Sequence, residues 1–417
     1  MTGRYHGERL GACTDCRRFW ARYRAGEITG EEIAEVEDSL AVTAGTCAVM
    51  GTASTMACIA ETLGMALPGT AAIPAVHADR LRAAEATGET AVTLARNRLT
   101  PDRILTAAAF ENAVRVLLAI GGSTNAIIHL TAVAGRLGVP IDLAAVNRLS
   151  DETPVLVDLK PSGQHYMEDF FAAGGLGAVL RELRDRLHLD CLTVTGETLG
   201  ARLDSDDAWV DRAVIRSARE PFQAVGGLVA LFGSLAPGGA ILKRSAADAR
   251  LFEGEARAVV FDSLEDLAAR IDDPALDVTP ADFLVLKNAG PKGAPGMPEA
   301  GYLPIPTKLS RAGVTDMVRI SDARMSGTAF GTIVLHVTPE AAAGGPLGAV
   351  RTGDRIRLSV KNRRLDVLVE PSELARRAAG ARPVTAPPRG YRRLYAEHVL
   401  QADQGCDFDF LRADGRR

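Results

Sequence analysis

Three residues of this 417-residue chain stand in segments whose composition suits metal or proton chemistry: Cys47, Glu299 and Ser326. Cys47 precedes a run of small residues that favours a helix, and a thiolate near the positive end of a helix dipole is a good metal ligand. Glu299 ends a loop rich in Gly and Pro, and a rigid loop that presents one carboxylate suits Mg²⁺. Ser326 precedes a glycine, with Arg324 nearby, and a loop serine can act as a nucleophile or base when a cation lowers its pKa.

Each of the three residues also has a simpler interpretation. Free cysteine is among the most buried residue types, so Cys47 can be structural. Glu299 can be the solvated end of an elaborate turn, and Ser326 can bond to its own backbone in a turn. The pattern alone leaves both interpretations open for each residue.

Two further motifs carry weaker signals. Cys13 and Cys16 form a C-x-x-C pair, which can hold zinc or exchange thiols, but no second pair lies at zinc spacing and no thioredoxin-like pattern surrounds it. The segment 122–125 (Gly-Ser-Thr-Asn) opens a predicted helix. Its N–H groups can hold a carboxylate or phosphate, or its side chains can simply cap the helix.

The elements that must position these residues divide the chain into two halves. In the first half, Thr29 and Glu32 fit a capping box, and helices are predicted at 50–63 (stopped by Gly64), from Pro101 to about residue 120, and at 126–137. A short strand is predicted at 154–157. This half is interpreted as an α/β or mostly helical domain.

The second half favours short strands. Residues 355–360 and 365–369 alternate apolar and polar side chains around a polar turn, which predicts a hairpin. Several such strands indicate a β-barrel or barrel-like sandwich. We place the boundary between residues 218 and 235, with domains at 1–225 and 226–417. The tail from residue 375 is interpreted as packing on the surface or on another subunit, so a homo-oligomer (dimer or tetramer) is expected.

Composition excludes several classes of protein. The formal charge is −4, without long runs of one sign, which argues against nucleic acid or an anionic membrane as the main partner. No window reaches 18 apolar residues, and residues 1–20 lack the apolar stretch of a signal peptide. Six cysteines in a chain of this length argue against a disulfide framework. A cytoplasmic location is therefore expected.

Taken together, segments 45–56, 121–125, 290–299 and 322–331 resemble the dihydroxy-acid/6-phosphogluconate dehydratase family over nearly the whole chain. Segments 9–17 and 405–410 are similar to its sugar-acid branch, which includes arabinonate and xylonate dehydratases. The resemblance implies an N-terminal α/β domain that holds an iron–sulfur cluster, and a C-terminal β-barrel-like domain that closes over it. It also implies that Cys47 is the third cysteine ligand of a [2Fe–2S] or [4Fe–4S] cluster, Glu299 a Mg²⁺ ligand and Ser326 the catalytic base.

The sequence departs from this family pattern ahead of Cys47. The resemblance implies two more cluster cysteines, the second in a Cys-Asp-Lys segment that also helps to bind Mg²⁺. No Cys-Asp-Lys segment occurs here, and Cys13 and Cys16 lie too close to Cys47 and in the wrong motif. We therefore expect an N-terminally truncated chain with an incomplete cluster-binding domain.

The implied reaction removes water from a 2,3-dihydroxy sugar acid and gives a 2-keto-3-deoxy acid. One alternative is a dihydroxy-acid dehydratase of branched-chain amino-acid synthesis. Another is an inactive remnant that only binds partner subunits, and a third is a thiol-redox or zinc protein that uses Cys13 and Cys16.

Overall fold

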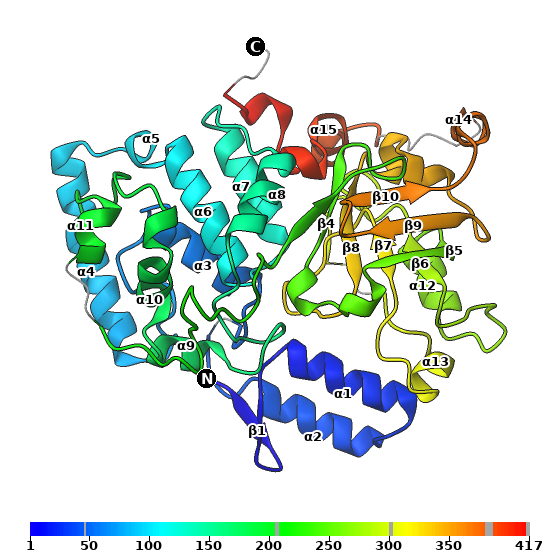
Figure 1. Ribbon diagram of the computed structural model, residues 1–417, viewed down its shortest axis with the longest axis horizontal. Coiled ribbons are helices and arrows are strands. Elements are labelled where there is room, and N and C mark those ends of the chain that lie inside the picture. Colours follow the sequence, from blue (N-terminus) through cyan, green and yellow to red (C-terminus); the bar gives the residue numbers. More distant parts are fainter. Residues whose placement is uncertain (46, 205–207, 300–302, 380–386, 414–417) are drawn as a thin grey trace. The chain divides into compact units, whose positions relative to one another are not determined.

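The computed structural model describes residues 1–45, 47–204, 208–299, 303–379 and 387–413 (Figure 1). The chain is mixed α/β and divides into two compact units. The first unit comprises Met1–Trp20, Ile28–Ala126 and Arg148–Gly227, and the second comprises Ala21–Glu27, Ile127–Asn147 and Leu228–Arg417.

Ahead of residue 228, the described part of the chain is mostly helical, with one hairpin of two short strands, β1 (Gly3–Tyr5) and β2 (Glu8–Leu10). The α-helices of this stretch are α1 (Thr14–Ala25), α2 (Gly30–Leu40), α3 (Thr52–Thr62), α4 (Ala78–Asn97), α5 (Pro101–Ile104), α6 (Ala107–Ala119), α7 (Asn125–Gly135), α8 (Leu143–Glu152), α9 (Met167–Ala172), α10 (Gly175–Glu182) and α11 (Leu199–Asp204).

Local signals set the ends of several of these helices. The capping box predicted ahead of α2 is confirmed, since Glu32 N–H donates to Thr29 Oγ1 at 3.1 Å and Thr29 N–H donates to Glu32 Oε2 at 2.7 Å. Helix α3 ends where predicted, because Gly64 follows it with φ +80°. The single helix predicted from Pro101 to about residue 120 is wrong: Thr106 accepts a hydrogen bond from Ala109 N–H and starts a second helix, α6.

The strand predicted at 154–157 forms only isolated bridges, one between Val155 and Gln223 and one between Val157 and Ile215. These bridges are part of the core of the first unit. There α3 and α10 pack on α6, and α9 packs on α10. Phe170 and Leu180 are among the buried side chains of this core.

The second unit is built on an eight-stranded sheet in the order β10-β9-β5-β6-β7-β8-β4-β3. Strands β5 to β8 run parallel to one another, and the remaining pairs are antiparallel. The strands are β3 (Val229–Leu231), β4 (Gly239–Leu242), β5 (Glu253–Phe261), β6 (Phe283–Leu286), β7 (Arg319–Ser321), β8 (Ile333–Thr338), β9 (Arg355–Ser359) and β10 (Arg364–Val367).

The two edges of this sheet meet. Phe232, directly after β3, bridges Arg364 of β10. Its N–H donates to Arg363 O at 2.9 Å, and its carbonyl accepts from Leu365 N–H at 2.9 Å. The sheet is therefore a nearly closed barrel, in agreement with the barrel expected from the sequence (Figure 1).

The parallel strands are buried on both faces, which explains their continuous apolar runs. Val260 and Val285 point into the barrel core, whereas Val259 and Leu284 belong to an outer layer covered by α12 (Leu264–Arg270) and α13 (Thr307–Arg311). The remaining described α-helices are α14 (Pro371–Ala379) and α15 (Gly390–His398).

The hairpin predicted near the C-terminus is confirmed as β9 and β10, which pair from Ser359 and Arg364 onward. Residues 380–386 of the predicted C-terminal tail lie outside the described residues. Among the helices that the structure describes, none combines the length and the apolar character needed to cross a membrane.

Asn147 of α8 fastens this helix to the edge strand β3. Its Nδ2 donates to Ala230 O at 2.9 Å, and its Oδ1 accepts from Ala230 N–H at 2.9 Å, in buried surroundings. We expect Asn147→Ala to lower the free energy of unfolding by about 2–4 kcal/mol, because both buried backbone groups lose their partner. Urea denaturation measures this change. The exposed neighbour is the control: Arg148→Ala should stay within about 0.5 kcal/mol, and an Asn147→Ala variant as stable as wild type would contradict the assignment.

Candidate active site

Two loops of the second unit carry Glu299 and Ser326. The Gly/Pro loop (residues 289–299) comes after β6, and the serine loop (residues 322–331) comes after β7. Since β6 and β7 are parallel neighbours, both loops leave the sheet at the same edge, the carboxyl ends of the strands. This is the edge where α/β sheets commonly bind ligands.

One buried carboxylate, Glu340, anchors the Gly/Pro loop. Lys292 N–H donates to both of its oxygens at 2.9 Å, and Gly293 N–H donates to Oε2 at 3.0 Å. Gln401 Nε2 donates to Oε1 at 2.7 Å. A Cβ atom on Gly290 would lie 2.6 Å from Glu340 Oε2, so the close approach requires glycine at that position.

A second buried carboxylate, Asp322, starts the serine loop. It accepts from Ala289 N–H at 3.0 Å and from Ala341 N–H at 2.9 Å. Burial raises the pKa of Asp322 to about 6, and nearby Glu340 raises it too, although the two backbone donors act in the opposite direction. Ala289 begins the Gly/Pro loop and Ala341 follows β8. The Asp322 side chain therefore connects the serine loop to the Gly/Pro loop and to the segment after β8.

Glu299 lies beside the serine loop. Its Oε1 is 3.0 Å from Nη1 of Arg324, and the two residues also form an isolated backbone bridge. Arg324 Nε donates to Met297 O as well. The structure therefore brings two of the predicted site residues, Glu299 and Ser326, onto neighbouring loops, joined through Arg324.

Ser326 is half-buried in a tight turn. Its Oγ lies 2.8 Å from Thr328 Oγ1, and Thr328 N–H donates to it at 3.4 Å. This turn matches the simpler interpretation of the sequence, in which Ser326 bonds to the backbone of its own turn. It also brings one N–H donor to the Ser326 oxygen, together with a hydroxyl that can act as donor or acceptor. Donors aimed at an oxygen stabilise negative charge on it.

Two histidines near Arg324 gave no signal in the sequence. His336 of β8 is buried, and burial lowers its pKa to about 3, with Arg324 and His129 of α7 adding to the effect. Burial and Arg324 also lower the pKa of His129. Within the described residues, Nε2 of His336 has no hydrogen-bond partner. The lowered pKa values favour the neutral form of both imidazoles.

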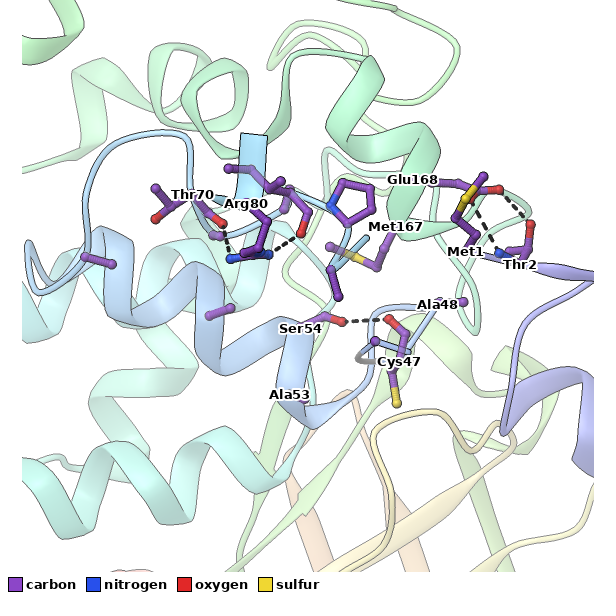
Figure 2. Close-up of a pocket in the computed structure, with 18 of the residues that line it drawn as sticks. Met1, Thr2, Cys47, Ala48, Ala53, Ser54, Thr70, Arg80, Met167 and Glu168 are labelled. Carbon is purple, nitrogen blue, oxygen red and sulfur yellow. Dashed lines mark hydrogen bonds between the residues drawn. The ribbon is translucent and has the colours of Figure 1, made fainter. Parts of the chain in front are cut away.

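Cys47 belongs to the first unit and lines a cavity of about 380 Å³ there (Figure 2). Alanines make up much of the lining. Ser54 Oγ donates to Cys47 O at 3.3 Å and to Val49 O at 3.0 Å, which folds the Cys47 segment over the first turn of α3. Figure 2 shows the Cys47 sulfur pointing away from the Arg80 side of the cavity. Thr46, in the same motif, lies outside the described residues.

The described residues do not complete a metal site. All six cysteines are described, and none of them forms a disulfide within the described residues. Yet within the described ranges no three His, Cys, Asp or Glu side chains come together as a possible metal site. An iron–sulfur cluster needs several cysteine thiolates, so Cys47 alone cannot hold one. Burial raises the pKa of Cys16, with Cys13 adding to the effect, which is the opposite of what a thiol-exchange pair needs.

The Gly-Ser-Thr-Asn segment at the start of α7 forms a buried polar network with α3. Ser123 N–H donates to Thr55 Oγ1 at 3.0 Å, and Ser123 Oγ is 2.9 Å from Thr52 Oγ1. Asn125 N–H donates to Ser123 Oγ at 3.2 Å. These contacts favour the capping interpretation over an anion site.

Three functional candidates were missed from the sequence: Lys243, Glu340 and Thr328. Lys243 donates from Nζ to Gly327 O at 3.3 Å, behind the serine loop. Neither Lys243 nor Glu340 lies in a recognisable motif, because their importance comes from burial and from contacts distant in sequence. Thr328 lies within the serine loop. Its position two residues after Ser326 is the sequence feature that could have identified it.

Comparison with known proteins identifies the family. The N-terminal domain model of the dihydroxy-acid/6-phosphogluconate dehydratases matches residues 2–202, and the C-terminal domain model matches residues 213–406. Both domains are thus represented, and these matches give no support to the expected truncation or to an incomplete N-terminal domain.

Curated relatives agree with these matches. The chain is 50% identical to an L-arabonate dehydratase of Azospirillum brasilense and 46% identical to a 6-deoxy-6-sulfo-D-gluconate dehydratase of Pseudomonas putida, in each case over 99% of this chain and 72% of the relative. It is 40% identical to a dihydroxy-acid dehydratase of Syntrophobacter fumaroxidans, over 92% of this chain and 69% of that protein. The chain therefore belongs to the dihydroxy-acid/6-phosphogluconate dehydratase family.

Proposed function

We propose that this chain is a hydro-lyase that removes water from a 2,3-dihydroxy sugar acid and yields a 2-keto-3-deoxy acid. The observation that carries the proposal is the geometry of Ser326, whose Oγ is held by Thr328 in a loop joined to Glu299 through Arg324. The sugar-acid preference is supported by the relatives, because those that act on sugar acids share 46–50% identity and the dihydroxy-acid dehydratase 40%.

In this proposal Ser326 is the base. Its ionised Oγ takes the proton from C2, so an O–H bond forms as the C2–H bond breaks. The electron pair becomes the C2–C3 double bond, and the C3 hydroxyl leaves and becomes water with a proton from the solvent or Ser326. The hydroxyl and the N–H of Thr328 donate to the ionised Oγ of Ser326 and stabilise it before the substrate reacts. The enol product then tautomerises to the keto acid.

The cofactor proposal is narrower. In this family an iron–sulfur cluster is generally required, and we propose Cys47 as one cluster ligand and Glu299 as one Mg²⁺ ligand. The described residues supply no complete ligand set for either the cluster or Mg²⁺. Two alternatives remain: a branched-chain dihydroxy acid as the substrate, and a chain without turnover. Turnover measured on arabinonate and on dihydroxyisovalerate distinguishes both from the main proposal.

We also propose a two-domain organisation with the division near residue 225, a cytoplasmic location and a homo-oligomer. Six cysteines without a disulfide among the described residues fit a reducing compartment. The described C-terminal residues expose large side chains, among them Tyr391 (70%) and Phe410 (51%), which fits a surface covered by another copy. Light scattering that finds a monomer would contradict the oligomer.

The base assignment predicts that Ser326→Ala lowers kcat on arabinonate by about 10²–10⁴-fold, the usual contribution of a positioned general base. Thr328→Val keeps the shape of the side chain but loses its hydroxyl, so we expect a smaller loss of about tenfold or more. Steady-state turnover measures both, with Ser310→Ala in α13 as the control. Normal turnover by Ser326→Ala would contradict the assignment of Ser326 as the base. Faster turnover of dihydroxyisovalerate than of arabinonate would favour the branched-chain alternative.

The ligand assignment predicts that Cys47→Ala lowers the iron and sulfide content of anaerobically purified protein to less than about half of the wild-type content, since cluster thiolates are not replaceable by alanine. Cys58→Ala is the matched control, because Cys58 is fully buried and burial raises the pKa of its thiol. Inductively coupled plasma spectrometry and sulfide analysis give both contents. Wild-type protein that holds no iron would show that Cys47 is not a cluster ligand in this chain.

A further inference from the structure

Lys243, which directly follows β4, is a buried lysine that has no carboxylate partner among the residues that the structure describes. The chain has only six lysines among its 48 basic residues. Two others with little exposure have acidic partners: Lys160 Nζ lies 2.8 Å from Asp15 and Lys287 Nζ lies 3.1 Å from Asp262. Lys243 is only 8% exposed and, within the described ranges, its Nζ makes one hydrogen bond, to Gly327 O at 3.3 Å, and no ion pair.

The neighbouring elements do not neutralise this lysine. Strand β8 carries His336, and β3 has no ionisable side chain. In the serine loop, Asp322 accepts from the N–H groups of Ala289 and Ala341, and Arg324 pairs with Glu299. None of these groups is ion-paired with Lys243 in the described chain. Burial alone lowers the pKa of Lys243 to about 7. A buried, unpaired ammonium group destabilises the folded state, so its position under the serine loop calls for a functional explanation.

The contacts of Gly327 supply one. The carbonyl that accepts from Lys243 and the N–H of Thr328 are the two ends of the same peptide group. That N–H donates to Ser326 Oγ at 3.4 Å. A charged donor on the carbonyl polarises the peptide and strengthens the hydrogen bond at its other end, because hydrogen bonds in series reinforce one another in a low-dielectric interior.

We propose that Lys243 is a positioning residue for Ser326: its ammonium group polarises the 327–328 peptide and thereby stabilises the ionised serine. The inference rests on the proposed function, in which Ser326 is the base. Lys243 does not touch the substrate, and its effect reaches Ser326 through the peptide group.

Reactivity of Ser326 tests the relay without turnover. Diisopropyl fluorophosphate forms a bond from serine Oγ to phosphorus and expels fluoride, so its labelling rate follows the ionised fraction of the hydroxyl. Mass spectrometry of the Ser326 peptide gives the rate from pH 6 to 9. We expect Lys243→Met to label about tenfold more slowly at neutral pH, which corresponds to a rise of roughly one unit in the pKa of Ser326.

Two variants serve as controls. Lys243→Arg keeps the charge and should label within about threefold of wild type, whereas Lys287→Met removes a buried lysine that has its own acidic partner and should leave the rate unchanged. Wild-type labelling at Ser326 no faster than at Ser310, or equal rates for wild type and Lys243→Met, would overturn the relay. Labelling as expected without turnover of any sugar acid would instead refute the proposed function and leave the relay standing.

Stability against pH provides a second readout. The pKa of Lys243 falls from 10.5 to about 7 on folding, so the unfolded chain binds more protons between these values. The contribution of Lys243 to stability is therefore complete above pH 10.5 and is lost as the pH falls through 7. We expect Lys243→Met to melt higher than wild type by roughly 5 °C at pH 6, with a smaller difference at pH 9. A difference independent of pH would show that no buried charge is present and would overturn the proposal.

Discussion

The candidate site depends on two buried carboxylates that accept hydrogen bonds from backbone rather than from cations. Asp322 and Glu340 together take N–H groups from the start and the middle of the Gly/Pro loop, and from the segment after β8. Such bonds to a charged acceptor are stronger than neutral ones, and they fix backbone directly. The loops that carry Glu299 and Ser326 are thus ordered by their main chains.

Much of the fold could be predicted where local chemistry decides the outcome. The capping box at Thr29, the stop at Gly64 and the hairpin of β9 and β10 all follow from short-range patterns that the structure confirms. The break at Thr106 was missed because a threonine inside an apolar helical pattern can equally continue the helix. Helix α4 was missed because it buries none of its residues, so it has no apolar stripe to show periodicity.

Some residues of the candidate site could be predicted from the sequence and others could not, and the difference has a physical cause. Glu299 and Ser326 stand in loops whose Gly and Pro content is visible in the sequence. Lys243, Glu340 and His336 lie among apolar strand residues or just beyond them, and they matter because the barrel buries them next to particular carbonyls and N–H groups. Burial of a charged or polar side chain is a property of the assembled sheet, so spacing along the chain does not reveal it.

The barrel can close only after its last strand, β10, has been synthesised. The last sheet contact joins Phe232 to Arg364, across more than a hundred residues of intervening chain. A growing polypeptide cannot make that contact until the hairpin of β9 and β10 has left the ribosome, so β3 waits as an open edge while the chain between is made. Contacts so distant in sequence are also slow to form. Between translation of β3 and of β10, the edge of β3 is therefore open to strand-to-strand association with other nascent chains.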